Sequence, residues 1–506
     1  MKKSLRFLAF FIVLLICVAA LSCAKTGEGD TETTTVSGDS DSNSETTDPN
    51  VDEKGYEKDN LPEGLNFDSD VNILHWTEVK RVEFFAEKET GDVANDAVFI
   101  RNLNIEERLG VKLVWYGQPG DVSNTANFVN VVQKSYTAGE RAYDLIATYS
   151  RTAGLLSVDG FLADINTIDD SYLDFTKPWW PDNMLDTVTV GDSVFFITGD
   201  AATSVLHYMT AIFYNKKLLD DYGIQYPSTD VQNDTWTLDR LVEITSNHYQ
   251  DLDGNNKQSD GDFYGFTTIY YNADAFYTGS AMWLVERDPD GLLKISDDFV
   301  SERAINLVDK LGRWLTTDTC YVSRHGAALD YYTPFANGTA LACQLRTFMI
   351  DPAGPCSLTN VDWEFGIVPN PKFDDNQENY ATIIGNPFTL FGIMKDADDD
   401  TKSMCTAVLE CWGSEAYRLT TPAVFEICMK LKYSATETES AMFDVVRGSI
   451  VFDLGRIFSE DLNRISEMPS KAMTTGGSWA TLSKTYKKAL DTMMKKINGS
   501  FANQTN

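Results

Sequence analysis

The stretch that begins with YDLIATY (residues 143–149) decides the fold of this chain. It continues through GFLADI (160–165), PWWP (178–181), VFFITGD (194–200) and IFYNK (212–216). Short apolar runs bounded by Gly, Pro and Asp are typical of buried strands that alternate with helices. No nucleophile, base and orienting group cluster in this stretch, so it predicts a scaffold that holds a molecule rather than one that cleaves it.

The residues before this stretch repeat the same alternation. Strands are predicted at 71–76, 111–115 and 143–147, and helices at 98–109 and 126–136. Strands that alternate with helices favour an α/β fold, in which a parallel sheet is covered by helices on both faces. Ligands of open α/β sheets bind beyond the carboxyl ends of the strands. This rule singles out the residues directly after two strands, Trp76-Thr77-Glu78 and Tyr149-Ser150-Arg151.

The chain then enters a second region after Asp200. A strand is predicted from about Tyr208 to Lys216, and Thr237 is a suitable N-cap for a helix. Apolar residues recur at helical spacing between Ile305 and Leu315, and 341–348 is predicted as a return strand. From Asp396 onward the pattern is mainly helical.

Aromatic side chains make up 12% of the residues, which suits a saccharide cleft. Sugar rings offer apolar C–H faces to aromatic rings, and their hydroxyls need polar partners. Strand-end or loop aromatics that could serve are Trp76, Tyr149, Tyr270, Tyr271 and Trp283. Each of them could equally belong to the core. Trp179 and Trp180 precede a turn and are expected to pack beneath a loop.

The charge balance excludes nucleic acid as a partner. The chain has 506 residues, with 75 acidic and 42 basic side chains and a formal net charge of −33. Such a surface repels a phosphate backbone. The four His residues form no HExxH motif, and no GxSxG, Walker A or GxGxxG spacing occurs. We therefore expect no enzyme, although carboxylate pairs suited to glycoside hydrolysis are left open as an alternative.

The N-terminus predicts export. Basic Lys2, Lys3 and Arg6 precede an apolar run at 7–21, which predicts a signal peptide over 1–22. Cys23 follows small residues and resembles the lipidated Cys of bacterial lipoproteins. An uncleaved anchor is the alternative, although the run is shorter than the roughly 20 residues that a span needs. From Cys23 to residue 60 we expect a disordered acidic tether, and over 61–506 the folded body.

Two local features suggest a calcium site and a disulfide. Asp251, Asp253, Asn255 and Asp262 supply oxygens at calcium-loop spacing, although Gly254 is displaced from the EF-hand position. The sequence therefore suggests a calcium site, with an ordinary Asp/Gly/Asn turn as the alternative. Cys343 and Cys356 flank a Pro/Gly loop and are a candidate disulfide, with buried thiols as the alternative.

In this order, the motifs YDLIA, GFLADI, PWW and YNK resemble family 1 extracellular solute-binding proteins, the ABC-importer lipoproteins related to maltose-binding protein. Downstream matches are WTLD (236–239), YTPFANG (332–338) and FGIVP (365–369). The resemblance implies a two-lobed type II periplasmic-binding-protein fold with a ligand cleft between α/β lobes. The expected first lobe is about 66–200 plus 326–385, and the second is about 201–325 plus 386–506.

The resemblance also implies a function. It adds Glu78, Arg151, Asp200 and Arg346 as polar ligand contacts, although Arg346 could equally form a buried ion pair. The expected protein is a monomer, lipid-anchored to the outer face of a bacterial membrane. It would capture a saccharide by lobe closure and deliver it to ABC permease subunits, and an oligosaccharide is the expected class. An exported glycan-cleaving enzyme and an adhesion module are the alternatives.

Overall fold

The computed structural model of the chain describes residues 50–79, 82–181, 183–324, 330–352 and 357–504. The predicted signal peptide, Cys23 and most of the tether lie outside the described residues, as does Cys356 of the candidate disulfide. Across the described residues, no helix combines the length and apolar character that crossing a membrane requires.

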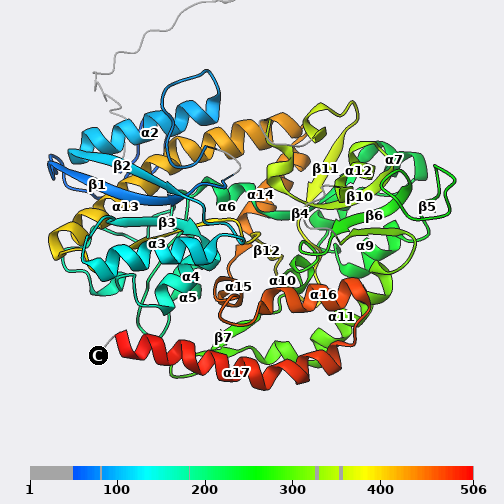
Figure 1. Cartoon of the computed structure of the whole chain (residues 1–506). Helices are drawn as coiled ribbons and strands as arrows, with labels where there is room; N and C mark the ends of the chain where they lie inside the picture. Colours follow the sequence, from blue (N-terminus) through cyan, green and yellow to red (C-terminus); the bar gives the residue numbers. More distant parts are fainter. Residues whose placement is uncertain (1–49, 80–81, 182, 325–329, 353–356, 505–506) are drawn as a thin grey trace, which may run out of the picture. The chain divides into compact units, whose positions relative to one another are not determined.

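The first lobe is built on a four-stranded sheet with the order β13-β3-β1-β2. The strands β1, β2 and β3 run parallel, and β13 runs antiparallel to β3. Figure 1 shows the helix α2 above this sheet and α3 and α4 below it, and α13 packs against α2. The bounds of these elements are β1 (Ser69–Trp76), α2 (Val93–Leu109), β2 (Val111–Gln118), α3 (Thr125–Ala138), β3 (Leu145–Tyr149), α4 (Ser150–Val158), β13 (Thr389–Ile393) and α13 (Asp399–Arg418).

The second lobe is built on a six-stranded sheet with the order β11-β4-β10-β6-β5, and β9 also pairs with β6. Its strands are β4 (Thr210–Asn215), β5 (Tyr249–Gln250), β6 (Phe263–Ile269), β9 (Cys320–Ser323), β10 (Ala340–Arg346) and β11 (Phe365–Val368). The pairs of β6 with β9 and with β10 are parallel, whereas β4 runs antiparallel to β10 and β11. This sheet is therefore mixed, where a mostly parallel one was expected.

The strand pairing differs from the expected division into lobes. The strands β10 and β11 lie within 326–385, which was expected in the first lobe, yet both pair within the second sheet. Conversely, β13 lies beyond residue 386 and joins the first sheet. The antiparallel pairings of β4 with β10 and of β3 with β13 account for this difference, because each places the return strand beside a strand from much earlier in the chain.

The remaining elements connect and cover the sheets. Short strands form two separate pairs: β7 (Val285–Arg287) with β8 (Leu293–Ile295), and β12 (Thr382–Ile383) with β14 (Ile450–Val451). The other helices are α5 (Met184–Val188), α6 (Thr203–His207), α7 (Lys216–Tyr222), α8 (Pro227–Gln232), α9 (Leu238–Thr245), α10 (Ala275–Gly279), α11 (Glu302–Leu315), α12 (Thr333–Ala336), the π-helix η6 (Pro422–Leu431), α14 (Glu437–Gly448), α15 (Leu454–Ile457), α16 (Met468–Thr475) and α17 (Trp479–Gln504). Thr237 caps α9 as predicted, because its side chain accepts a hydrogen bond from the Arg240 amide.

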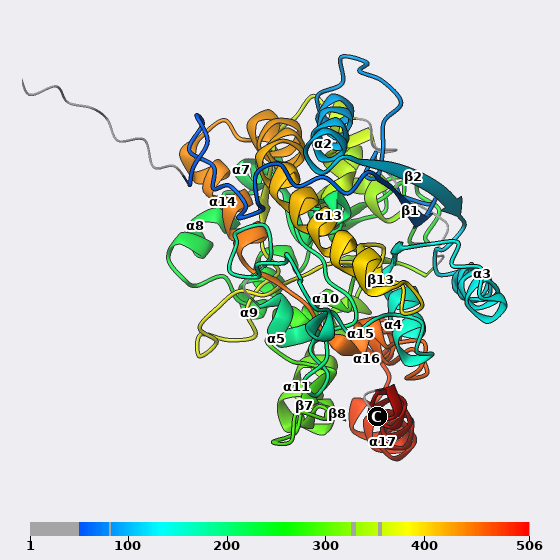
Figure 2. The ribbon, with the colours of Figure 1, turned by 90° about the vertical axis from the view of Figure 1, so that its left-hand side faces the viewer.

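The C-terminal helix α17 connects both lobes. Near its start, the Trp479 indole donates to the Phe299 carbonyl oxygen at 3.1 Å in the second lobe. Near its end, the Phe501 ring stacks on Phe195, and the Gln504 amide donates to the Ser157 carbonyl oxygen at 2.9 Å in the first lobe. Figure 1 shows α17 running along the lower edge of the body, and Figure 2 shows it end-on beside β8.

Residues 50–60 belong to the folded body, although the sequence suggested a disordered tether up to residue 60. Asp59 has a fully buried side chain and pairs with Arg108 of α2 at 2.5 Å. Glu57 pairs with buried Lys177 at 2.8 Å. Because these ion pairs engage buried partners, the folded body begins about ten residues before Leu61.

A buried carboxyl group lies at the centre of the first lobe. Glu83 is 2% exposed and accepts a hydrogen bond from the Ser204 hydroxyl at 2.9 Å. Burial raises the pKa of Glu83 to about 7, against an opposing effect of Ser204 and of the Arg101 charge. Arg101 is itself fully buried and stacks over the Trp412 ring.

We expect Glu83 to make the protein less stable as the pH rises through neutrality. A carboxyl whose folded pKa lies above its unfolded value stabilises the fold when protonated, so its effect disappears as the pH rises from about 4.5 to 7. Glu83→Gln should raise the free energy of unfolding at pH 8 by on the order of 1–3 kcal/mol, with the difference shrinking towards pH 5. Thermal unfolding of both proteins between pH 5 and pH 8 measures this. An equal difference at both ends of the range would contradict it.

Candidate functional site

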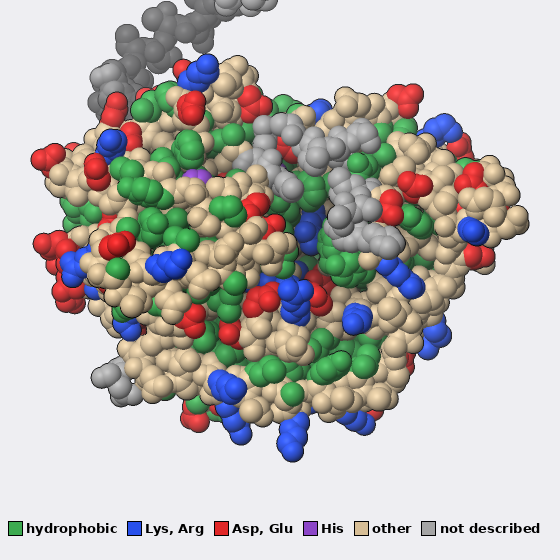
Figure 3. Space-filling model, viewed as in Figure 1, with side chains coloured by type: hydrophobic (Ala, Val, Ile, Leu, Met, Phe, Trp, Pro, Cys, Tyr) green, Lys and Arg blue, Asp and Glu red, His purple; other side chains and the backbone are tan. Residues whose placement is uncertain are grey.

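The carboxyl ends of strands from both lobes meet at one gap. β1 and β3 of the first sheet end at Trp76 and Tyr149, and β6 and β10 of the second end at Ile269 and Arg346. Ligands of open α/β sheets bind at such ends. Figure 3 shows acidic and basic side chains gathered at the middle of this face, where the surface is hollowed.

Three tyrosines and one arginine form what we call the tyrosine–arginine site: Tyr149, Tyr208, Tyr271 and Arg346. The Arg346 guanidinium lies 4.9 Å from the centre of the Tyr271 ring and 5.8 Å from that of Tyr208. Tyr149 approaches from the first lobe. Burial raises its pKa, and the charges of Arg151, Arg346 and Arg456 oppose this rise.

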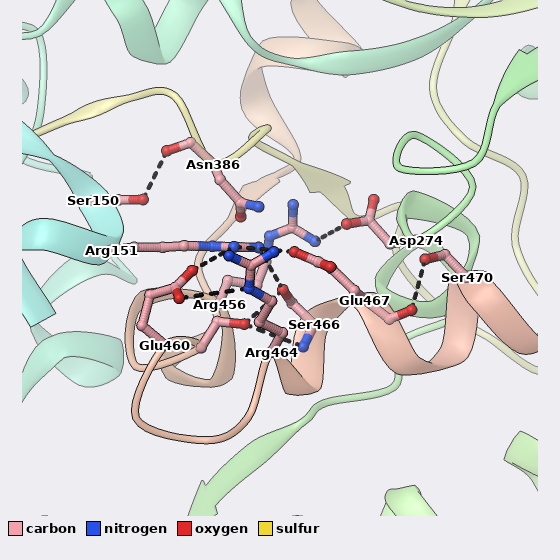
Figure 4. A network of polar contacts seen from close by, with 11 residues as sticks. Ser150, Arg151, Asp274, Asn386, Arg456, Glu460, Arg464, Ser466, Glu467 and Ser470 are labelled. Atoms are coloured by element: carbon pink, nitrogen blue, oxygen red, sulfur yellow. Dashed lines mark hydrogen bonds and ion pairs between the residues drawn. The ribbon is translucent and has the colours of Figure 1, made fainter. Parts of the chain in front are cut away.

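A second group of charged side chains lies beside this site, and we call it the arginine network. Arg151 extends from the first turn of α4, and its Nη1 donates to Glu460 at 2.8 Å and to Glu467 at 3.1 Å. Its Nη2 donates to the Ser466 hydroxyl at 3.0 Å. Figure 4 shows Arg456 and Arg464 beside Arg151, with Arg456 turned to Asp274 of the second lobe at 2.7 Å. The network therefore joins the first lobe, the second lobe and the C-terminal segment.

Polar atoms without partners accumulate here. The buried atoms Arg151 Nε, Arg346 Nε, Arg456 Nε and Arg456 Nη2 have no hydrogen-bond partner within the described residues. The buried Asn386 side-chain oxygen also has no hydrogen-bond partner within the described residues, and Figure 4 shows this amide directed towards the arginines. A buried donor without an acceptor costs about 1–3 kcal/mol. Such an accumulation of donors offers hydrogen bonds to a polar ligand.

The structure brings four of the predicted ligand residues to this gap: Tyr149, Arg151, Tyr271 and Arg346. Two others lie beside it. Trp76 is 1% exposed, its ring lies 5.7 Å from that of Tyr149, and its indole donates to the Thr389 hydroxyl. Glu78 accepts hydrogen bonds from the Gly120 amide at 2.9 Å and from the Asn124 amide at 3.1 Å. Both therefore have partners within the first lobe, and their contact with a ligand stays a prediction.

The structure does not bring Asp200 and Trp283 into this cluster. Asp200 lines a cavity of about 530 Å³ with Trp180 and Arg447, and burial raises its pKa to about 6 in spite of the Arg447 charge. Trp283 lines a cavity of about 260 Å³ near β7. Within the described part of the chain, neither residue forms a ring contact or hydrogen bond with the tyrosines of the site, so their role in binding stays a prediction.

The acidic loop predicted to bind calcium lies at the turn between β5 and β6. Oxygens of Asp251, Asp253 and Asp262 all lie within 4.8 Å of one another. The Asn255 side-chain oxygen, however, accepts a hydrogen bond from the Lys257 amide at 2.7 Å. The carboxylates also accept bonds from loop amides, as an ordinary turn would have them do. Calcium binding stays a prediction, and calorimetric titration of the chelator-treated protein checks it.

Sequence reasoning missed most of the arginine network. Asp274 follows Tyr271 by three residues, so the strand-end rule could have identified it. Arg456, Glu460 and Glu467 follow no strand of either sheet and belong to a helical region without a recognisable motif. Tyr208, which lies where the chain enters the second lobe, gave no signal beyond its aromatic ring.

We expect Arg151 to stabilise the fold by joining the first lobe to Glu460 and Glu467 of the C-terminal segment, in addition to lining the site. Arg151→Ala should lower the free energy of unfolding by about 2 kcal/mol or more, because it leaves Glu460 and Glu467 without their shared cation. The matched control is Arg464→Ala, which removes a half-exposed arginine 3.6 Å from the same Glu460 and should cost less than about 1 kcal/mol. Urea unfolding compares the three proteins. An equal loss of unfolding free energy in both variants would contradict this structural role of Arg151.

No protein-family model matches the chain, and no curated protein sequence matches it. Solved structures do match. A cyclic α-maltosyl-1,6-maltose binding protein from Arthrobacter globiformis superposes with a TM-score of 0.55 and 14% sequence identity, over 84% of this chain and 99% of that one. The galacto-N-biose-/lacto-N-biose I-binding protein of an ABC transporter from Bifidobacterium longum gives 0.53 and 11%, over 85% and 97%.

A third match is an ABC substrate-binding protein from Listeria monocytogenes in complex with cycloalternan. Its TM-score is 0.51 at 13% identity, over 84% of this chain and 99% of that one. At these identities the comparison establishes the fold. The fold predicted from the resemblance is thereby confirmed: this chain has the two-lobed, periplasmic-binding-protein-like architecture of these ABC solute-binding proteins.

Proposed function

We propose that this protein is the extracytoplasmic substrate-binding protein of an ABC importer, and that it captures an oligosaccharide between its lobes. The observation that carries the proposal is the tyrosine–arginine site. Its three tyrosine hydroxyls and the Arg346 guanidinium form no hydrogen bond with any described residue. Aromatic rings beside unpaired donors match the two faces of a sugar, apolar C–H and polar hydroxyl. The matched structures, whose names describe binding of maltosyl, galacto-N-biose and cycloalternan saccharides, support the same class of ligand.

Capture follows from the position of the site between two lobes. A ligand that touches Tyr149 on one lobe and Tyr271 on the other binds the closed arrangement better than the open one. Its differential affinity therefore shifts the population towards closure. The closed form would dock on the permease subunits, and the ligand would leave unaltered.

The rival reading, a glycan-cleaving enzyme, requires two carboxyls with separate roles. Glu460 and Glu467 are an acidic pair at the gap, and both contact the same Arg151 Nη1. Their shared ion pair with Arg151 gives both carboxylates a structural role that requires no catalysis. Long incubation with oligosaccharides followed by chromatography should therefore show no products, and product formation would favour the enzyme.

Binding is tested by calorimetry with a panel of oligosaccharides. A bound sugar should raise the melting temperature by mass action and compact the protein in solution scattering. Tyr271→Ala should weaken the affinity by about 3- to 30-fold, because it removes one stacking ring. The control is Tyr222→Ala on α7, a ring that is 51% exposed, and its affinity should match that of the unmodified protein. A panel in which nothing binds would overturn the proposal.

We also propose that the protein is anchored by lipid on Cys23 after removal of 1–22. The basic start, the apolar run and the small residues before Cys23 support this, and an anchored binding protein would stay close to its permease. In cells, the full-length protein should fractionate with membranes and incorporate labelled palmitate, whereas Cys23→Ala should lose the label. Retention of the label in the variant would refute lipidation at this residue.

A further inference from the structure

Arg346 differs from every other arginine at the gap because it has no acidic partner. Arg151 pairs with Glu460 and Glu467, Arg456 with Asp274, and Arg464 with Glu460. Arg346 is 8% exposed, yet within the described part of the chain its guanidinium forms neither an ion pair nor a hydrogen bond. A desolvated guanidinium without an anion is costly, and such groups are normally paired.

Two acids act on the tyrosines of the site, Asp330 and Glu83, and neither forms an ion pair with Arg346 within the described residues. Asp330 raises the pKa of the Tyr271 hydroxyl, and its Oδ2 accepts a hydrogen bond from the Tyr321 hydroxyl at 3.0 Å. Its buried Oδ1 has no hydrogen-bond partner among the described residues, and no ion pair joins it to Arg346. Glu83 acts on Tyr208, but it is held by the Ser204 hydroxyl and lies near Arg101. Within the described residues, no carboxylate therefore neutralises the Arg346 charge.

The surroundings of Arg346 also determine which of its edges is open. The backbone of Gly385 lies against the guanidinium, because a Cβ placed on that residue would come within 2.5 Å of Nε and 2.6 Å of Cζ. Nε is buried and has no hydrogen-bond partner among the residues that the structure describes. The two Nη atoms form the remaining edge, whose parallel N–H groups match the two oxygens of a carboxylate.

We propose that the ligand is an acidic oligosaccharide, and that the carboxylate of a uronic acid unit binds to the Nη1 and Nη2 edge of Arg346. Tyr208 and Tyr271 flank this guanidinium, so the ring that carries the carboxylate lies beside these two tyrosines. This inference depends on the proposed function and names the class of sugar. A chain with a net charge of −33 repels an anion in general, so a local cation is needed to bind one.

The test compares matched sugars on the full-length mature protein by calorimetry. The probes are α-1,4-linked galacturonate di- and trisaccharides, β-linked glucuronate-containing disaccharides, and their neutral galactose and glucose counterparts. At least one acidic sugar should bind about 10-fold or more tightly than its neutral counterpart, which is the range of a charge-assisted bidentate pair. Raising the salt concentration should weaken the acidic sugar more than the neutral one.

Variants assign the selectivity to Arg346. Arg346→Gln should remove most of the preference for the acidic sugar and change the neutral affinity little, and Arg346→Lys should fall between because it keeps the charge but loses the planar fork. Gly385→Ala, which displaces the guanidinium without removing it, should also reduce the preference. Arg313→Gln makes the same charge change on the exposed face of α11 and should leave the preference intact. Circular dichroism verifies that each variant is folded.

The outcomes are distinguishable from those of the broader proposal. Neutral sugars that bind as well as acidic ones, or an acidic preference that survives Arg346→Gln, would overturn this inference and leave oligosaccharide binding in place. A protein that binds neither series nor any sugar of the wider panel would overturn both.

Discussion

The meeting of strand ends from two sheets at one gap is the constraint on which the rest of the structure depends. Backbone pairing fixes where β3, β6 and β10 end. Tyr149 and Arg346 are the last residues of β3 and β10, and Tyr271 lies in the turn two residues after β6. Polar side chains at such ends cannot all be satisfied within one lobe. The unpaired donors at the gap are a consequence of that geometry, and a ligand that spans the gap can satisfy them.

The C-terminal segment limits how the lobes can move. The helix α17 is bound to the second lobe through Trp479 and Asn498, and to the first lobe through Phe501 and Gln504. Arg151 and Arg456 bind the preceding segment to both lobes as well. Closure that opened all these contacts would lose several hydrogen bonds and buried rings at once. Movement is therefore expected about an axis close to α17, which leaves the opposite side of the gap free to open.

The strand ends were predictable because local periodicity determines them. The strands at 71–76 and 111–115 and the N-cap at Thr237 are encoded by a few adjacent residues, and the structure contains them. The lobe boundaries were not predictable, since β10 and β13 pair with strands far away in the sequence, and no local pattern specifies that choice. Arg456, Glu460 and Glu467 were missed for the same reason: their importance arises from contacts with Arg151 and Asp274, which only the tertiary fold creates.

Arg151 and Arg346 differ in role: Arg151 stabilises the fold, whereas Arg346 is proposed to bind the ligand. Both are buried at the gap, and sequence reasoning assigned both to the ligand. Arg151 already has two carboxylates and a serine hydroxyl, so two of its three nitrogens are occupied before any ligand arrives. Arg346 has two aromatic rings and a glycine backbone around it, which hold the guanidinium in position without neutralising it. A cation that is held in position and left unneutralised gains most from an anionic ligand, because the reorganisation needed to bind it has already been made during folding.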